Sequence, residues 1–181
     1  MIQRTDYAAW DAAQKIVLPK QNAYDVLADA DRSRLDEAAF VALVDSYLLL
    51  SRFGVITLGV FSKSAPFIVG QVMYSNISRN IVQSARLSFA IFNNQWRKGF
   101  AREILIAGIM HSFGTLKFHR LEFWIHPNNV ASLRLVKSMR TRKECLKRQA
   151  LFIDGNWQDH IVFYTMANKW GATDLKPQIL I

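Results

Sequence analysis

The sequence has few of the features that mark secreted and membrane proteins. It contains one cysteine, Cys145, so no internal disulfide can form, and this predicts a reducing compartment such as the cytoplasm. Its apolar runs, such as residues 55–60, are far shorter than the roughly 20 residues of a membrane-spanning helix. The amino terminus lacks the apolar segment of a signal peptide. We therefore expect a cytoplasmic protein that does not enter a membrane.

Several common site motifs are also absent. The chain has no Walker loop, no Gly-x-Gly-x-x-Gly fingerprint and no Gly-x-Ser-x-Gly elbow. Its four histidines and its cysteine do not have the spacing of zinc ligands, so we expect no bound metal. No nucleic-acid motif with fixed spacing is present either, which argues against sequence-specific nucleic-acid binding.

The charge, in contrast, is strongly one-sided. The net charge is +9, which favours polyanionic partners such as nucleic acid, ribosomes or a phosphate-rich cofactor. Seven basic residues fall between positions 134 and 148: Arg134, Lys137, Arg140, Arg142, Lys143, Lys147 and Arg148. This cluster is either a solvated helix end and loop or a patch that faces phosphates.

At 181 residues the chain is long enough for one domain with a full core, and we expect a single domain over 1–181. Its apolar patterns predict a short helix at 7–15 and a second helix that starts near Ser33–Asp36. The later elements are strands at 55–60, 67–76 and 85–92, a helix at 99–113, a strand at 120–126, a helix at 129–139, and a hairpin of strands at 146–153 and 160–166. This order predicts an α/β (α+β) layer fold with helices packed on a mixed sheet.

A basic turn with one glycine precedes the predicted helix at 99–113. A helix start has unpaired N–H groups and the positive end of the helix dipole, so it suits a phosphate group. Gly99 allows close backbone approach, and Arg97, Lys98 and Arg102 add positive charge. An ordinary helix cap on a solvated loop explains the same residues.

Asn129 and Ser132 open the next predicted helix. Asparagine before a helix is a common cap, and serine in a first turn is unremarkable. In a cleft, the Ser132 hydroxyl would instead donate a proton or hydrogen bond to a leaving thiolate. Glu103 and Glu122 are the candidate carboxylates, but neither stands out as a general base.

Taken in order, four segments resemble the GNAT N-acetyltransferase superfamily. Within it they are most similar to the Rim-type ribosomal-protein N-terminal (alanine) acetyltransferases. The segments are residues 68–76, the turn at 96–103, the corner at 127–132 and the hairpin Asp154-Gly-Asn-Trp-Gln-Asp-His160. The resemblance runs from about residue 53 to 170, across most of the chain.

This resemblance implies acetyl-CoA as the cofactor and a mostly antiparallel central sheet. It also implies a V-shaped splay between the strands near 86–92 and 120–126. Ser132 would be catalytic, near the sulfur, and Asn129 would contact the pantetheine arm. The remaining implied cofactor residues are Phe89, Ala90, Ile91 and Phe92 on the strand, and Arg97, Lys98, Gly99, Phe100, Ala101 and Arg102 at the phosphate turn.

The sequence departs from the family pattern at several positions. The turn is one residue shorter than in the nearest branch, Trp96 stands at a Gln/Arg position, and Arg97 replaces a glycine. Arg140-Thr141 and Cys145 stand where the family has Gly-Phe and a later glycine. The family's first strand is barely represented before the first helix.

We expect direct transfer of acetyl to a primary amine, foremost the α-amine of a protein N-terminus such as a ribosomal protein. A second hypothesis is a small-molecule acceptor, a polyamine, aminoglycoside or amino acid, because residues 15–52 are rich in carboxylates: Asp25, Asp29, Asp31, Asp36, Glu37 and Asp45. A third is a degenerate, non-catalytic acyl-CoA-binding domain. The sequence is compatible with a monomer or a homodimer.

Overall fold

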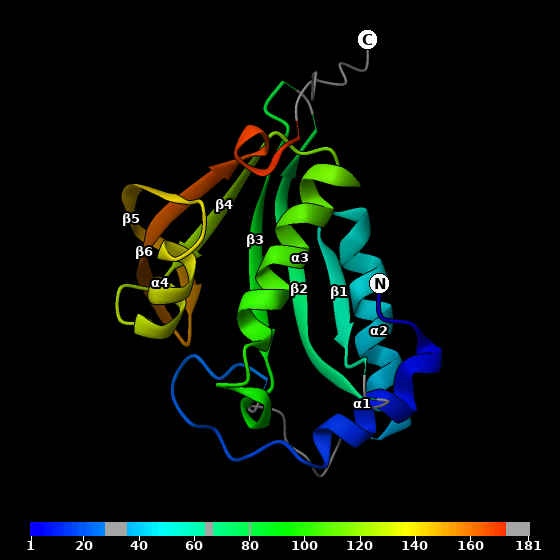
Figure 1. Cartoon of the computed structure of the whole chain (residues 1–181). Helices are drawn as coiled ribbons and strands as arrows, with labels where there is room; N and C mark the ends of the chain where they lie inside the picture. The colour runs from blue at the N-terminus through cyan, green and yellow to red at the C-terminus, as the bar shows by residue number, and fades with distance from the viewer. Residues whose placement is uncertain (28–35, 64–66, 80, 173–181) are drawn as a thin grey trace. The chain divides into compact units, whose positions relative to one another are not determined.

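The computed structural model describes residues 1–27, 36–63, 67–79 and 81–172 (Figure 1). The predicted order of helices and strands is confirmed. The elements are η1 (Arg4–Asp6), α1 (Tyr7–Gln14), α2 (Glu37–Arg52), β1 (Ile56–Phe61), β2 (Ile68–Ser78), β3 (Ser84–Ile91), η3 (Asn93–Gln95), α3 (Phe100–Gly114), β4 (Arg120–Ile125), α4 (Val130–Lys137), β5 (Arg142–Ile153), β6 (Asn156–Met166) and η4 (Ala167–Trp170).

The strands form one six-stranded sheet in the order β1-β2-β3-β4-β6-β5. The pairs β1–β2, β4–β6 and β5–β6 are antiparallel, so the predicted mixed, mostly antiparallel sheet is confirmed. β3 and β4 pair in parallel, and α3 provides the crossover that a parallel pair needs. This pairing covers only Ser84–Arg86 against Arg120–Glu122, and such a short parallel ladder agrees with the predicted splay.

The contacts divide the chain into two compact units. The first unit comprises Met1–Ser75 and Phe89–Ile106, and the second comprises Asn76–Ser88 and Ala107–Ile181. The expectation of one domain over 1–181 stays a prediction. No helix in the described ranges has the length and apolar character needed to cross a bilayer.

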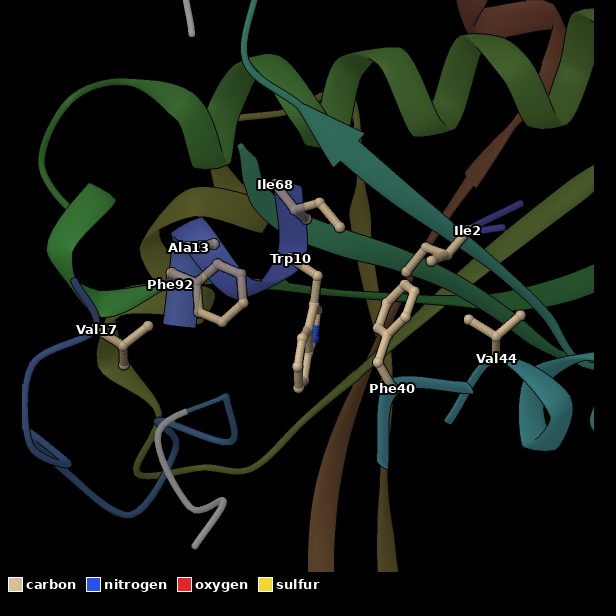
Figure 2. Close-up of a cluster of buried hydrophobic side chains, with 8 residues drawn as sticks. All are labelled: Ile2, Trp10, Ala13, Val17, Phe40, Val44, Ile68 and Phe92. Atoms are coloured by element: carbon tan, nitrogen blue, oxygen red, sulfur yellow. The ribbon is translucent and has the colours of Figure 1, made fainter. Parts of the chain in front are cut away.

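The core of the first unit forms around aromatic side chains from α1 and α2 (Figure 2). The rings of Trp10 and Phe40 pack with centroids 5.1 Å apart, and both side chains are buried. Phe92, directly after β3, and Ile68, at the start of β2, belong to the same cluster. The α2 helix begins at the predicted Asp36 cap, whose carboxylate accepts the Ala39 N–H at 2.8 Å.

The second unit has its core under β4. Leu121, Phe123 and Ile125 alternate with less buried residues and point to the same buried side, as their spacing of two predicts. Its hairpin turns at Asp154 and Gly155, whose φ angles are 51° and 77°. Two positive φ angles are what a type I′ turn requires, so the predicted hairpin is confirmed.

Some predicted boundaries were wrong. β5 begins at Arg142 rather than Leu146 and β6 at Asn156 rather than His160. The added residues are mostly polar and show no apolar alternation, so the pattern did not predict them. The predicted helix to Met139 ends at Lys137, where the Ser138 N–H bonds back to helix carbonyls. Ser33, at the predicted start of the second helix, lies outside the described residues. Residues 64–66, between the predicted strands at 55–60 and 67–76, lie outside them as well.

Candidate functional site

The turn before α3 has an unusual backbone. Arg97 and Gly99 are both left-handed, with φ angles of 63° and 87°. The Gly99 carbonyl accepts the N–H groups of Arg102 at 3.1 Å and Glu103 at 3.3 Å, so the helix hydrogen bonding begins here. The N–H groups just ahead of these two belong to the helix start and have no helical acceptor.

Arg97 explains how the turn tolerates a departure from the family pattern. It stands where related turns carry glycine, the residue that adopts positive φ without steric cost. Arginine holds the same left-handed conformation here, with φ at 63°, at a cost of about 1–2 kcal/mol. The turn therefore keeps a glycine-type geometry although the glycine is absent.

The start of α3 fits a diphosphate group. A Cβ built on Gly99 would meet no atom within 4 Å, so the space beside its backbone is open. Arg97, Lys98 and Arg102 are all exposed around this opening. Open backbone, helix-start amides and three cations are together the donor set that phosphate oxygens require.

The predicted cofactor strand, Phe89–Phe92, lies in the same unit as this turn. Two of its backbone groups already have partners: the Phe92 N–H donates to Val69 O at 3.1 Å, and Ile91 O accepts the Trp96 indole N–H at 2.9 Å. Trp96, at the family's Gln/Arg position, thus ties the turn back to the end of β3.

Sequence reasoning missed the part played by Asn93. Its Oδ1 accepts the Leu18 N–H at 2.8 Å, and its Nδ2 donates to Leu18 O at 2.8 Å and to Asp25 Oδ2 at 2.9 Å. This buried amide holds the segment after α1 beside the end of β3. The polar triplet at 93–95 predicted only a strand end, and its tertiary contacts have no local signal.

A cavity of about 380 Å³ opens beside the end of β3, within the first unit. None of its lining residues is charged: Ile2, Trp10, Gln14, Val26, Leu27, Ala39, Leu43, Tyr47, Ile68, Gly70, Gln71 and Phe92. Across it the Tyr47 hydroxyl donates to Gln71 Oε1 at 3.1 Å. Burial raises the pKa of Tyr47, so the hydroxyl remains a neutral donor at physiological pH.

The described carboxylates of residues 15–52 are engaged elsewhere. Asp25 is buried and also accepts the Gln21 N–H at 3.0 Å, Asp36 caps α2, and Asp45 pairs with Arg4 at 2.7 Å. Glu37 is exposed in the first turn of α2. Asp29 and Asp31 lie outside the described residues. Three of the four described carboxylates thus have partners within the fold, and Glu37 is the exposed one.

In the second unit, Asn129 caps α4. Its Oδ1 accepts the Ser132 N–H at 3.2 Å, so the capping interpretation of this pair is confirmed. Ser132 is half-buried in the first turn of α4. The corner before the helix is fixed by His126, whose Nδ1 accepts the Asn128 N–H at 3.1 Å.

The two candidate carboxylates have different surroundings. Glu103 is exposed on α3, in the same unit as the phosphate-fitting turn. Glu122 accepts hydrogen bonds from Arg120 at 3.1 Å and from the Trp124 indole at 2.8 Å. In the described part of the chain, no group of three or more His, Cys, Asp or Glu side chains is arranged to hold a metal ion.

The predicted site residues fall into two sets. The strand residues Phe89–Phe92 and the turn residues 97–102 lie in the first unit, and Asn129 and Ser132 lie in the second. A family model described as an acetyltransferase (GNAT) domain matches residues 4–142. The chain belongs to the GNAT acetyltransferase family. Members of this family use acetyl-CoA, which agrees with the fit of the α3 start to phosphate.

Curated relatives match a part of the chain. It is 30% identical over 104 residues to a probable N-acetyltransferase, YjcK, of Bacillus subtilis, covering 58% of each protein. It is 29% identical over 112 residues to the ribosomal protein uS5 alanine N-acetyltransferase of Escherichia coli, covering 62% of this chain and 58% of that one. The chain thus spans less than two thirds of the length of these relatives.

Solved structures share the fold. RimJ of Mycobacterium smegmatis, in complex with CoA-disulfide, superposes with a TM-score of 0.74 at 21% identity over 93% of this chain and 80% of that one. Spermidine N-acetyltransferase of Vibrio cholerae, with CoA and spermine, gives 0.63 at 21% identity over 75% and 78%. At this level of identity the likeness shows the fold and does not distinguish between acceptors.

Proposed function

We propose that this protein transfers an acetyl group from acetyl-CoA to the α-amine of a protein N-terminus. The observation that carries the proposal is the uncharged cavity beside Phe92. It lies in the same unit as the phosphate-fitting turn and shares Phe92 with the predicted cofactor strand. Its volume falls in the range of small-ligand sites, and its apolar lining suits the side chains of a peptide's first residues.

The residues of the chain would divide the work as follows. The amides and cations of 97–102 would hold the diphosphate, and the backbone of Phe89–Phe92 would align the pantetheine arm. Bound acetyl-CoA would supply an activated acetyl thioester. A base or water chain would take the proton of the attacking amine, and the Ser132 hydroxyl would donate a proton or hydrogen bond to the departing thiolate. Much of the acceleration comes from holding amine and thioester together.

The acceptor class follows from proton chemistry as well as from the cavity. An amine attacks only when neutral, and Glu122, one of the two candidate carboxylates, already accepts a hydrogen bond from the Trp124 indole. At pH 7 roughly one in seven α-amines is neutral, whereas roughly one in 2,500 alkylamines with the pKa of lysine is. An N-terminal α-amine therefore needs less help from a base than a polyamine does, which supports the α-amine as the acceptor.

The relatives support the same choice to a limited extent. One sequence relative is named as an alanine N-acetyltransferase of ribosomal protein uS5. We therefore propose a ribosomal protein as the natural acceptor. The net charge of +9 would attract the protein to ribosomal RNA, close to such an acceptor.

The test is a comparison of acceptors at a saturating concentration of acetyl-CoA, with CoA release as the readout. One peptide begins with a free alanine and contains no lysine. Its matched control has a formylated N-terminus and one internal residue replaced by lysine, and is otherwise the same. Spermidine is the third acceptor. We expect kcat/KM for the free peptide to exceed both others by roughly 350-fold, in proportion to the neutral amine fraction.

Two results would contradict the proposal. Turnover of spermidine equal to or faster than that of the free peptide would move the acceptor to small cationic amines. Tight binding of acetyl-CoA by calorimetry, without turnover of any amine, would support the non-catalytic alternative.

A further inference from the structure

The β5 strand carries a concentration of positive charge at an edge of the sheet. It is the last strand in the sheet order, so one side of its backbone has no neighbouring strand among the described residues. Four basic residues on it are exposed: Arg142, Lys143, Lys147 and Arg148. Arg148 also lies 3.8 Å from the Asp159 carboxylate, and Lys147 Nζ lies 3.9 Å from the centroid of the Trp124 ring, and a phosphate would compete with both contacts. Its single acidic residue, Glu144, already pairs with Arg120.

Two large aromatic side chains lie exposed at the end of the same hairpin. Phe152 is 60% exposed and Trp157 is 62% exposed. Their rings pack edge to face with centroids 5.4 Å apart, across the paired positions of β5 and β6. The contact orients both rings but covers little of them, so a flat ligand has access to an aromatic surface.

The backbone of β5 argues against a second copy of the chain as the partner. Its register shifts between Lys143 and Cys145 and again between Lys147 and Leu151, and Gln149 has a φ of 47°. Such bulges interrupt the regular ladder that strand pairing needs. Two copies would also bring like charges together. The charge is complementary to a polyanion instead.

We propose that β5 and the Phe152–Trp157 pair form a binding surface for single-stranded RNA. Single-stranded nucleic acids are bound by positive charge that follows the backbone and by aromatic rings that stack on unpaired bases. The twelve-residue strand spans roughly 35 Å, which is long enough to follow several nucleotides. Recognition is independent of base sequence, because every base offers a face for stacking. This surface is independent of the acetyl-transfer proposal.

The experiment measures fluorescence anisotropy of a labelled oligouridine of about 12 nucleotides, titrated with the full chain at several salt concentrations. Four neutralised phosphates predict a slope of log K against log salt near −3, and the Arg142→Gln/Lys143→Gln double variant should reduce its magnitude by about 1.4. Trp157→Ala should weaken binding by roughly tenfold, through the loss of stacking on one base. A duplex RNA of equal length should bind more weakly than the single strand.

Matched controls come from the first unit. Arg52→Gln/Lys63→Gln removes two exposed positive charges elsewhere, and Phe53→Ala removes an aromatic ring that is 77% exposed. Both should leave the affinity for RNA within about twofold, and circular dichroism verifies that all variants fold. If the control variants lose as much affinity for RNA as the hairpin variants do, binding depends on net charge alone and the proposal is overturned. Absence of binding at low salt would also overturn it, as would a dimer in sedimentation that Trp157→Ala dissociates.

Discussion

Gly70 on β2 and Ala90 on β3 approach so closely that a Cβ on Gly70 would lie 2.2 Å from Ala90 O. The same added atom would lie 3.0 Å from the Ile91 Cα, so backbone surrounds the position. Gly70 also lines the uncharged cavity. The absence of one side chain thus permits the close strand contact next to the proposed acceptor pocket and the predicted cofactor strand.

Gly70→Ala should therefore disturb the first unit. Because backbone cannot rotate away as a flexible side chain does, the strands must separate, and we expect a loss of about 1–3 kcal/mol in the free energy of unfolding. Urea denaturation measures the change. Gly114→Ala is the control, since a Cβ there meets nothing within 4 Å. A stability of Gly70→Ala equal to that of the wild type would show that the strands are not held at this distance.

Gly99→Val should weaken the binding of acetyl-CoA. A β-branched residue is strained at a φ of 87°, and its side chain fills the open space beside the helix-start amides. Loss of one charge-assisted hydrogen bond, about 1.5–3 kcal/mol, corresponds to a Kd roughly 10- to 150-fold higher by calorimetry. Gly171→Val places the same residue at a φ of 78°, also in open space, after η4. If both variants bind normally, the α3 start is not the phosphate site.

Ser132→Ala should lower kcat and leave the Kd for acetyl-CoA unchanged. A hydroxyl that stabilises charge only as sulfur departs contributes to the transition state, and removal of such a donor costs roughly 100-fold. Ser138→Ala is the matched control. Its hydroxyl donates to Leu135 O at 2.7 Å, just after the same helix. Wild-type turnover by Ser132→Ala would exclude the residue from the mechanism.

The sequence predicted the helices and strands whose buried residues recur at a regular spacing. The alternation of Leu121, Phe123 and Ile125 marked β4, and Asp154-Gly155 marked the hairpin turn. β5 was predicted too short because an exposed edge strand has no buried face, and residues such as Arg142 and Lys143 gave no alternation to detect.

The sequence predicted the parts of the candidate site that lie at helix starts. It did not predict the parts that depend on contacts between residues far apart in the chain. The helix starts at Gly99 and Asn129 could be predicted because helix starts have local signatures, and the roles of both residues in the site stay predictions. The Asn93 tether joins residues 75 positions apart, and the cavity combines α1, α2 and β2. The left-handed backbone of Arg97 was hidden because arginine seldom adopts it.

Substitutions of Asn129 can separate its cap from its proposed contact with the cofactor. Asn129→Ala removes the acceptor for the Ser132 N–H and should cost about 1 kcal/mol of stability. Asn129→Asp keeps an acceptor oxygen at that position but loses the amide donor. We expect Asn129→Asp to retain wild-type stability in urea and to bind acetyl-CoA more weakly. Normal affinity in this variant would limit Asn129 to capping.

His160 should make stability depend on pH. Burial lowers its pKa from the ordinary 6.5, and the nearby charges of His126 and Arg86 act in the same direction. The rings of His160 and His126 lie edge to face at 6.0 Å. Between the lowered folded value and 6.5 the unfolded chain binds more protons than the folded chain does. Stability is therefore lost as pH falls through this window.

The measurement compares urea midpoints at pH 7.5 and pH 5.5 for the wild type, His160→Gln and His119→Gln. Glutamine does not titrate, so His160→Gln should lose less stability on acidification than the wild type, whatever its stability at pH 7.5. His119 is exposed, and its replacement should leave the wild-type pH response intact. An unchanged pH response in His160→Gln would mean that another group carries the acid sensitivity.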